Sequence, residues 1–240
     1  MKHVIAVCAI FFSLLISSCI FNGRRVKGNG NLVSEQRSVS KADRIKLNGS
    51  MDVVLTKGAT AVKVEADENL MKYILIEEED GWLVIKTRKG IAFTGKNSVV
   101  VRVTTPNLRQ VSLAGSGDIT SEEKFENDDE IKLSVAGSGD ISLPVRTPMV
   151  TANITGSGDI NTRGETRNLK VSITGSGNFS GEALKAENAD INITGSGDAM
   201  VFADARLKGN IIGSGGIVYH GNPTVEKKIV GSGNISKAGE

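Results

Sequence analysis

The chain has no marked excess of charge of either sign and few aromatic residues. It carries 29 Lys and Arg residues against 27 Asp and Glu residues, and aromatic residues make up 4% of it. A balance this even gives no strong field for a nucleic acid or an acidic substrate, so we expect neither as a partner. The shortage of aromatic side chains argues against a carbohydrate groove built on ring stacking.

Cysteine is almost missing, and both cysteines lie near the N-terminus. Cys8 falls within an apolar run from Val4 to Ile16. That run is shorter than the roughly 20 residues that span a bilayer, and it suits the apolar region of a signal peptide. The small residues before Cys19 resemble a bacterial lipobox, in which the cysteine is acylated and becomes the new N-terminus. We therefore expect a lipoprotein signal peptide over residues 1–18 and lipidation at Cys19, followed by a flexible tether to residue 30.

Two alternatives stay open at this N-terminus: an ordinary signal peptide with a chance cysteine, and an uncleaved anchor helix. If the protein is a lipoprotein, Cys8 is removed with the signal peptide and Cys19 carries lipid. The mature chain then has no disulfide, no thiol nucleophile and no cysteine-based metal site. Its only histidine is His220. Such a fold has to be held together by packing.

What the chain does contain is a repeat. The tripeptide Gly-Ser-Gly begins at Gly115, Gly137, Gly156, Gly175, Gly195, Gly213 and Gly231, at intervals of 18 to 22 residues. A short motif that recurs at about twenty residues is typical of stacked repeat architectures.

Every copy has the same local pattern. Apolar and polar residues alternate before the glycines, which predicts a strand with one buried face. The glycines allow a sharp turn, an Asp or Asn usually follows, and an apolar residue then starts a second strand. We predict a structural role for these turn residues, which are Gly115, Ser116, Gly117, Asp118, Gly137, Gly139, Asp140, Gly156, Gly158, Asp159, Gly175, Gly177, Asn178, Gly195, Gly197, Asp198, Gly213, Gly215, Gly231, Gly233 and Asn234.

This pattern predicts an all-β fold, a parallel β-helix with one turn of the coil, or rung, every 18–22 residues. A βαβ crossover needs roughly 30 residues, which is more than the repeat offers. The strict six-residue apolar repeat of left-handed β-helices is missing, so we favour the right-handed form. One solenoid domain is expected over residues 31–240, with an irregular β-structured cap over 31–107 and the rungs over 108–240. Within the cap, residues 49–52 resemble a decayed copy of the repeat, and residues 67–74 predict one helical turn.

The order of these motifs resembles one bacterial family. A lipobox is followed by GNGNLVSEQRSVSKADRIKLNGSMDVVLTKG, VKVEADENLMKYI, GWLVIKT and then serial GSGD or GSGN rungs. The pattern is similar to the family called "putative auto-transporter adhesin, head GIN domain", over about residues 30–235. The resemblance implies a β-helical fold and a cell-envelope location. It implies no established activity and no catalytic residues.

The repeated acidic residues allow two chemical interpretations. Asp118, Asp140 and Asp159 should stack on successive rungs, where like charges repel unless something offsets them. Ca²⁺ could do so through oxygen ligands. We favour the other interpretation, in which each Asp or Asn accepts hydrogen bonds from backbone N–H groups of its own turn, because neutral Asn178 and Asn234 serve equally well. No metal or cofactor is therefore expected.

The function expected from the sequence is non-catalytic: an envelope lipoprotein, adhesin-like or structural, that presents a β-helical face to an envelope protein or glycan. The alternative is a polysaccharide-active β-helix enzyme, for which Arg146, Arg163 and Arg167 are the nearest basic candidates. A catalytic site needs unlike groups with different pKa values, whereas the acids here belong to the repeat itself. The chain has no acidic run directly after Cys19, so an anchored protein facing the periplasm is favoured over surface display.

Overall fold

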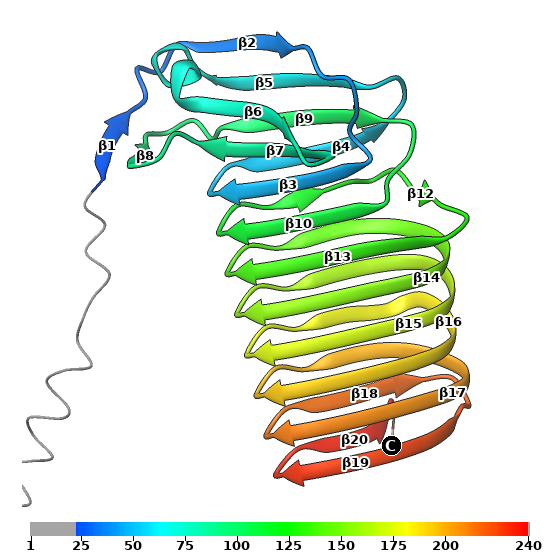
Figure 1. Ribbon diagram of the computed structural model, residues 1–240. Coiled ribbons are helices and arrows are strands. Elements are labelled where there is room, and N and C mark those ends of the chain that lie inside the picture. The colour runs from blue at the N-terminus through cyan, green and yellow to red at the C-terminus, as the bar shows by residue number, and fades with distance from the viewer. Residues whose placement is uncertain (1–22, 240) are drawn as a thin grey trace, which may run out of the picture.

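A computed structural model describes residues 23–239, and the predicted signal peptide and Cys19 lie outside this range. The chain forms a parallel β-solenoid with an antiparallel cap at its N-terminal end, as Figure 1 shows, so the predicted fold class is confirmed. Within residues 23–239 no helix is both long and apolar enough to cross a membrane.

Each rung is built from two strand segments that face each other across the core. The first segment ends in Gly-Ser-Gly at one edge of the coil, and the second starts just after it and runs back to the opposite edge (Figure 1). In the lower rungs the second segment continues around that opposite edge into the next first segment, as one long bent strand. The rungs comprise β10 (Gln110–Gly115), β11 (Ile119–Thr120), β12 (Phe125–Glu126), β13 (Glu130–Gly137), β14 (Ile141–Gly156), β15 (Ile160–Gly175), β16 (Phe179–Gly195), β17 (Ala199–Gly213), β18 (Gly216–His220), β19 (Thr224–Gly231) and β20 (Asn234–Lys237).

The repeat sets the register. Gly137 pairs with Gly156 and Gly156 pairs with Gly175, so equivalent residues stack directly above one another. Stacking gathers the alternating apolar residues of all rungs into one buried core. Strand β14, for example, contributes Val150, Ala152 and Ile154 to this core. No single rung could bury this face alone, and its stability comes from its neighbours.

The cap contains a full rung of its own. Gly49 pairs with Gly115, which confirms that residues 49–52 are a copy of the repeat. Above this rung the sheets continue into antiparallel strands, and the buried side chains of Leu70 and Met71 lie in a short 3₁₀ helix where one helical turn was predicted. The cap elements are β2 (Leu32–Arg37), β3 (Arg44–Gly49), β4 (Asp52–Lys57), β5 (Ala61–Asp67), η1 (Glu68–Tyr73), β6 (Ile74–Glu79), β7 (Trp82–Thr87) and β9 (Val100–Thr105).

The flexible tether predicted up to residue 30 is wrong for its last part. Strand β1 (Arg24–Lys27) pairs in parallel with β8 (Ile91–Thr94) and forms a small separate sheet. The next residues are fixed as well, because Asp67 accepts a hydrogen bond from the N–H of Gly30 at 3.1 Å. A Cβ on Gly28 would lie 1.8 Å from the Oδ2 atom of Asp67, so a side chain there would force the Asp67 carboxylate to move. The Gly- and Asn-rich composition thus serves close packing against the cap.

The C-terminal end of the coil is open. Among the described strands β19 pairs only with β17, so its other edge lies free. The interior position that holds Val171 and Ile191 in earlier rungs is Lys227 here. Lys227 reaches across the open end and donates from Nζ to the carbonyl oxygen of Ile235 at 2.6 Å. Ile212, Ile229 and Val230 are exposed around this end.

Candidate functional site

The Gly-Ser-Gly edge is held by a repeated backbone arrangement. The carbonyl oxygen of Gly137 accepts hydrogen bonds from the N–H of Ser157 at 2.8 Å and of Gly158 at 3.0 Å, both in the next rung. The same pair of bonds recurs from rung to rung along the edge. The first glycine has a positive φ, 117° at Gly156, which favours glycine. Each rung thereby satisfies two backbone donors of the next.

The third position of the tripeptide needs glycine for a different reason. Gly158 has no positive φ, but a Cβ there would lie 2.1 Å from the carbonyl oxygen of Gly139 and 2.9 Å from Val135 Cγ1. Rung-to-rung contact is therefore too close for any side chain. The sequence explained both glycines by turn conformation, whereas the structure shows that close approach explains the third one.

The Asp and Asn residues that follow form a ladder across the rungs. Asp118 Oδ1 accepts from the N–H of Asp140 at 3.0 Å, and Asp140 Oδ1 accepts from the N–H of Asp159 at 2.8 Å. The expectation that each residue binds its own turn is wrong, because the acceptor serves the next rung. The ladder starts at Asp52 and reaches Gly216, whose N–H binds Asp198 Oδ1 at 2.6 Å. Gly216 has no side chain to continue it, and the N–H of Asn234 binds the carbonyl of Gly215 instead, at 3.3 Å.

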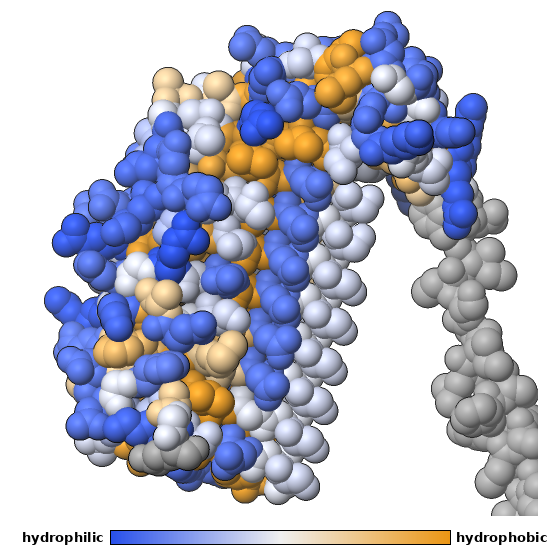
Figure 2. All heavy atoms as spheres, turned by 180° about the vertical axis from the view of Figure 1, so that it is seen from behind, coloured by the Kyte–Doolittle hydropathy of each residue, from blue (hydrophilic) through white to orange (hydrophobic). Residues whose placement is uncertain are grey.

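What this edge offers to solvent is a column of small hydroxyl groups. The middle serine of each copy is exposed, and Figure 2 shows the pale column of small residues along one edge beside a blue polar column. The exposed serines are Ser50, Ser116, Ser138, Ser157, Ser176, Ser196, Ser214 and Ser232. The backbone N–H groups of the turns and the Oδ1 atoms of the ladder bind within the coil, so this edge offers mainly serine hydroxyl groups and the second carboxylate oxygens to a partner.

The opposite edge carries a polar groove, which we call the far-edge groove. Its volume is about 590 Å³, and its lining residues are Glu126, Asn127, Asp128, Arg146, Thr147, Pro148, Glu165, Thr166, Arg167 and Glu187. Arg146 lies between two carboxylates, 4.0 Å from Glu126 and 3.4 Å from Glu165. Arg167 lies 3.8 Å from Glu187. These side chains are well exposed and come from successive rungs, so they form a line of alternating charge along the coil.

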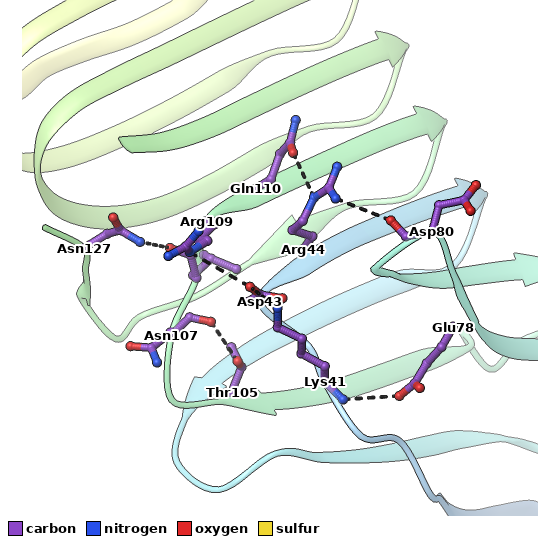
Figure 3. A network of polar contacts seen from close by, with 11 residues as sticks. Lys41, Asp43, Arg44, Glu78, Asp80, Thr105, Asn107, Arg109, Gln110 and Asn127 are labelled. Carbon is purple, nitrogen blue, oxygen red and sulfur yellow. Dashed lines mark hydrogen bonds and ion pairs between the residues drawn. The ribbon is translucent and has the colours of Figure 1, made fainter. Parts of the chain in front are cut away.

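A second cleft, of about 750 Å³, adjoins this groove on the cap side and shares Glu126, Asn127 and Asp128 with it. Figure 3 shows the polar network around it. Asp43 lies at its floor, with Oδ2 3.0 Å from Lys41 Nζ and 4.0 Å from Arg109 Nε. Its other oxygen, Oδ1, is buried and has no hydrogen-bond partner among the described residues.

The walls of this cleft are fixed by side-chain contacts to backbone carbonyls. Asn127 donates from Nδ2 to the carbonyl of Leu108 at 3.1 Å, and Thr105 donates from its hydroxyl to that of Asn107 at 2.8 Å. Phe125 lies fully buried nearby, so the long interval between the first two repeats is anchored in the core.

The cap wall is held by Glu78. Its carboxylate accepts hydrogen bonds from the hydroxyl of Ser40 at 2.8 Å and from the N–H of Lys41 at 3.2 Å. The Ser40 hydroxyl and then the N–H groups of Ser40 and Lys41 lower the pKa of Glu78, because these bonds favour the ionised form. Glu78 thus fixes the segment that carries Lys41 into the cleft.

The structure divides the predicted residues between the two edges. The turn residues of the repeat lie together along the Gly-Ser-Gly edge. Of the three arginines considered for an enzyme, Arg146 and Arg167 line the far-edge groove, while Arg163 pairs with Glu122 at 2.8 Å. Sequence reasoning missed Asp43 and Arg109, because nothing in the chain indicates that the two meet until the rung between them is folded.

Several solved structures share this fold. One from Parabacteroides distasonis ATCC 8503, described as a "putative lipid binding protein", is 27% identical with a TM-score of 0.75, over 90% of this chain and 100% of its own. A "putative adhesin" from Bacteroides fragilis NCTC 9343 is 20% identical with a TM-score of 0.81, over 88% of this chain and 99% of its own. A second "putative adhesin" from Parabacteroides distasonis ATCC 8503 is 25% identical with a TM-score of 0.68, over 90% and 100%.

Curated proteins give no match to this chain. Among protein families, the one described as "Putative auto-transporter adhesin, head GIN domain" matches residues 42–223. The match begins just before the first rung and includes most of the coil.

Proposed function

Because the chain belongs to the family described as "Putative auto-transporter adhesin, head GIN domain", we propose that it is a non-catalytic binding module of the cell envelope. In this proposal Cys19 carries lipid after removal of residues 1–18, and the domain faces the periplasm. The names of the similar structures, adhesin and lipid-binding protein, support a binding role. The lipobox supports the anchor.

The observation that carries the binding role is the far-edge groove with its adjoining cleft. Both are open, polar and continuous along successive rungs, a shape that suits an extended polar chain such as an envelope glycan or a protein segment. The carboxylates of Glu126, Glu165 and Glu187 lie within 4.0 Å of an arginine. Carboxylates paired in this way can position a ligand, but acid–base catalysis requires groups whose pKa values are set apart.

The binding role can be tested with purified protein and insoluble envelope polymer. We expect the chain to sediment with the polymer without shortening it. Arg146→Ala together with Arg167→Ala should weaken binding about tenfold or more, since each arginine removed takes away charge-assisted hydrogen bonds. The matched control is Arg37→Ala with Arg102→Ala, which removes two paired arginines of the cap, the first half-buried and the second exposed.

Release of new polymer ends would instead support the polysaccharide-active enzyme. Equal binding by the groove variant and the control variant would contradict the far-edge groove as the site. The anchor is tested separately, because Cys19→Ala should move the protein from the membrane to the soluble fraction. Rapid loss of the protein when intact cells are treated with protease would mean surface display.

A further inference from the structure

A cluster of cations gathers where the chain enters the fold, and we call it the basic corner. Arg24, Arg25 and Lys27 lie on β1, Arg88 and Lys89 lie in the turn before β8, and Lys96 follows β8. The pairing of Arg24 with Ile91 and Lys27 with Thr94 brings these residues onto one small sheet. The N–H of Arg24 also binds the carbonyl of Gly90, next to Lys89, at 2.7 Å. All six are exposed.

The arginines of the basic corner differ from the other arginines of the described chain. Arg24, Arg25 and Arg88 have no hydrogen bond or ion pair from their guanidinium groups to any residue within 23–239. The other eight arginines each have such a contact, as the pairs of Arg146, Arg167 and Arg206 along the far edge illustrate. Arg88 lies over the Tyr73 ring, with Cζ 5.8 Å from the ring centroid. Arg24 and Arg25 keep guanidinium groups that bind no residue within 23–239, so the three arginines can pair with an external anion.

The nearby acids do not neutralise this corner. Asp67 is buried and binds Gly30 and Asn97, while Glu68 accepts a hydrogen bond from Asn31. Charge is also unevenly divided along the molecule. Residues 23–105 contain fifteen Lys and Arg against ten Asp and Glu, whereas residues 106–239 contain thirteen against sixteen. Residues 23–105 are therefore positive by five charges, three of which come from β1, and residues 106–239 are negative by three.

We propose that the basic corner docks on the anionic surface of a lipid bilayer. The corner is a projecting two-stranded sheet, a shape that suits a flat charged surface (Figure 1). Leu32, 59% exposed at the start of β2, lies close to the same end of the cap and offers an apolar contact to the headgroup region. The proposal rests on the envelope location proposed above but is independent of acylation at Cys19. It gives the folded domain a second membrane contact, and one acyl chain with a basic patch holds a protein far better than either alone.

The test compares two matched triple variants of the full chain on vesicles. The corner variant loses three positive charges of the basic corner through Arg24→Gln, Arg25→Gln and Arg88→Gln. The far-edge variant loses the same charge from the far edge through Arg146→Gln, Arg167→Gln and Arg206→Gln. The partition coefficient of each variant is measured with two kinds of vesicle, one of mixed phosphatidylglycerol and phosphatidylcholine and one of phosphatidylcholine alone. The ratio of the two coefficients gives the charge-dependent part of the binding. Each basic residue near an anionic surface contributes about fivefold, so the corner variant should lose on the order of a hundredfold.

The expected result is a large loss for the corner variant, little loss for the far-edge variant, and recovery when the three arginines are replaced by lysine. High salt should remove the difference, because it screens charges beyond a few ångströms. The proposal is overturned if the two triple variants partition equally, or if the unaltered chain shows no preference for anionic vesicles. Binding to soluble dextran sulfate without binding to anionic vesicles would also overturn it, in favour of an acidic polymer.

The two proposals fail separately. Loss of envelope-polymer binding in the groove variant concerns only the far-edge groove, and the corner variant should bind that polymer as the unaltered chain does. Circular dichroism of each variant confirms folding, since all six substituted side chains are exposed.

Discussion

At the residue scale, the coil depends on how closely one rung approaches the next. The carbonyl oxygen of each first glycine receives two N–H groups from the following rung, and both glycines of the tripeptide lie against backbone above them. The serine between them donates one of these N–H groups, and its side chain is exposed to solvent. Glycine is therefore required twice per rung, for two different physical reasons.

Gly158→Ala should destabilise the protein strongly. The added Cβ would meet Gly139 O and Val135 Cγ1 within 3 Å, and neither group can move without shifting a neighbouring strand. Overpacking of this kind costs about 3 kcal/mol in the free energy of unfolding. Urea denaturation measures it. Ser157→Ala at the adjacent exposed position is the control, for which we expect a change within about 0.5 kcal/mol; similar values for the two variants would contradict the close-approach argument.

Asp159 tests the ladder. Its Oδ1 accepts from the backbone N–H of Asn178 at 2.7 Å and from the Asn178 side chain at 3.1 Å. Asp159→Asn keeps an acceptor oxygen and should leave the free energy of unfolding nearly unchanged, whereas Asp159→Ala leaves that N–H without its partner and should cost about 1–2 kcal/mol. Equal losses for the two variants would mean that charge, and not hydrogen bonding, matters there.

Removal of calcium tests whether the ladder of Asp and Asn residues binds a metal ion. Since the Oδ1 atoms already bind the next rung, we expect a chelator to leave the melting temperature unchanged. A large calcium-dependent rise would favour the metal interpretation, because a ligand that binds only the folded state raises its stability.

The structure places the predicted turn residues together at one edge, but it gives each Asp or Asn of the ladder a different partner from the one expected. A carboxylate in a repeat can reach its own turn or the equivalent turn one rung away, and both give the same period. Only the separation of the stacked backbones decides between them, and that separation follows from the glycines.

At the element scale, the two ends of the solenoid are protected differently. The N-terminal end is covered by antiparallel strands and by η1, whereas β19 keeps a free edge. A free edge invites pairing with another chain, and an inward-pointing charge is one way to prevent it. Lys227 is such a charge, and its bond to Ile235 closes the open core.

Lys227→Val should promote end-to-end association. Valine would restore the apolar position found in earlier rungs and leave a flat apolar edge ringed by Ile212, Ile229 and Val230. Light scattering should show a rise in mean mass with concentration. Lys228→Val, the same change on the outward face of the same strand, is the control; an unchanged mass for the Lys227 variant would show that this residue does not guard the edge.

Element assignments from sequence succeeded where the repeat is regular and failed for β1. The pattern of residues 24–27 has no alternation to indicate a strand, and their partner β8 lies more than sixty residues away. Pairing over such a distance leaves no local signal. The same reason hides the Asp43 cleft and the approach of Arg88 and Lys89 to β1, because both join residues from separate passes of the chain.

At the scale of the whole molecule, the rung is an interchangeable unit. Deleting residues 157–175 joins Gly156 to Ser176, in the register that already relates these rungs. We expect a folded protein whose long axis is shorter by about 4.8 Å, the distance between neighbouring strands. Small-angle scattering measures that length. A nine-residue deletion, 157–165, is the control, because it removes about half a rung and brings Arg167 to the crowded position of Gly158, so it should prevent folding; two folded products would contradict the repeat argument.

The register also affects the order in which parts of the protein fold. Within the coil each strand pairs with the next pass of the chain, as when Gly156 meets Gly175 after 19 residues. The cap joins the coil over longer separations, since Gly49 meets Gly115 after 66 residues. Closing a longer loop costs more entropy, and non-local pairing slows folding. The rungs can therefore nucleate anywhere and grow by addition, while the seam between β3 and β10 forms last. A refolding chain should therefore complete its rod before its cap, with the basic corner assembled at the end.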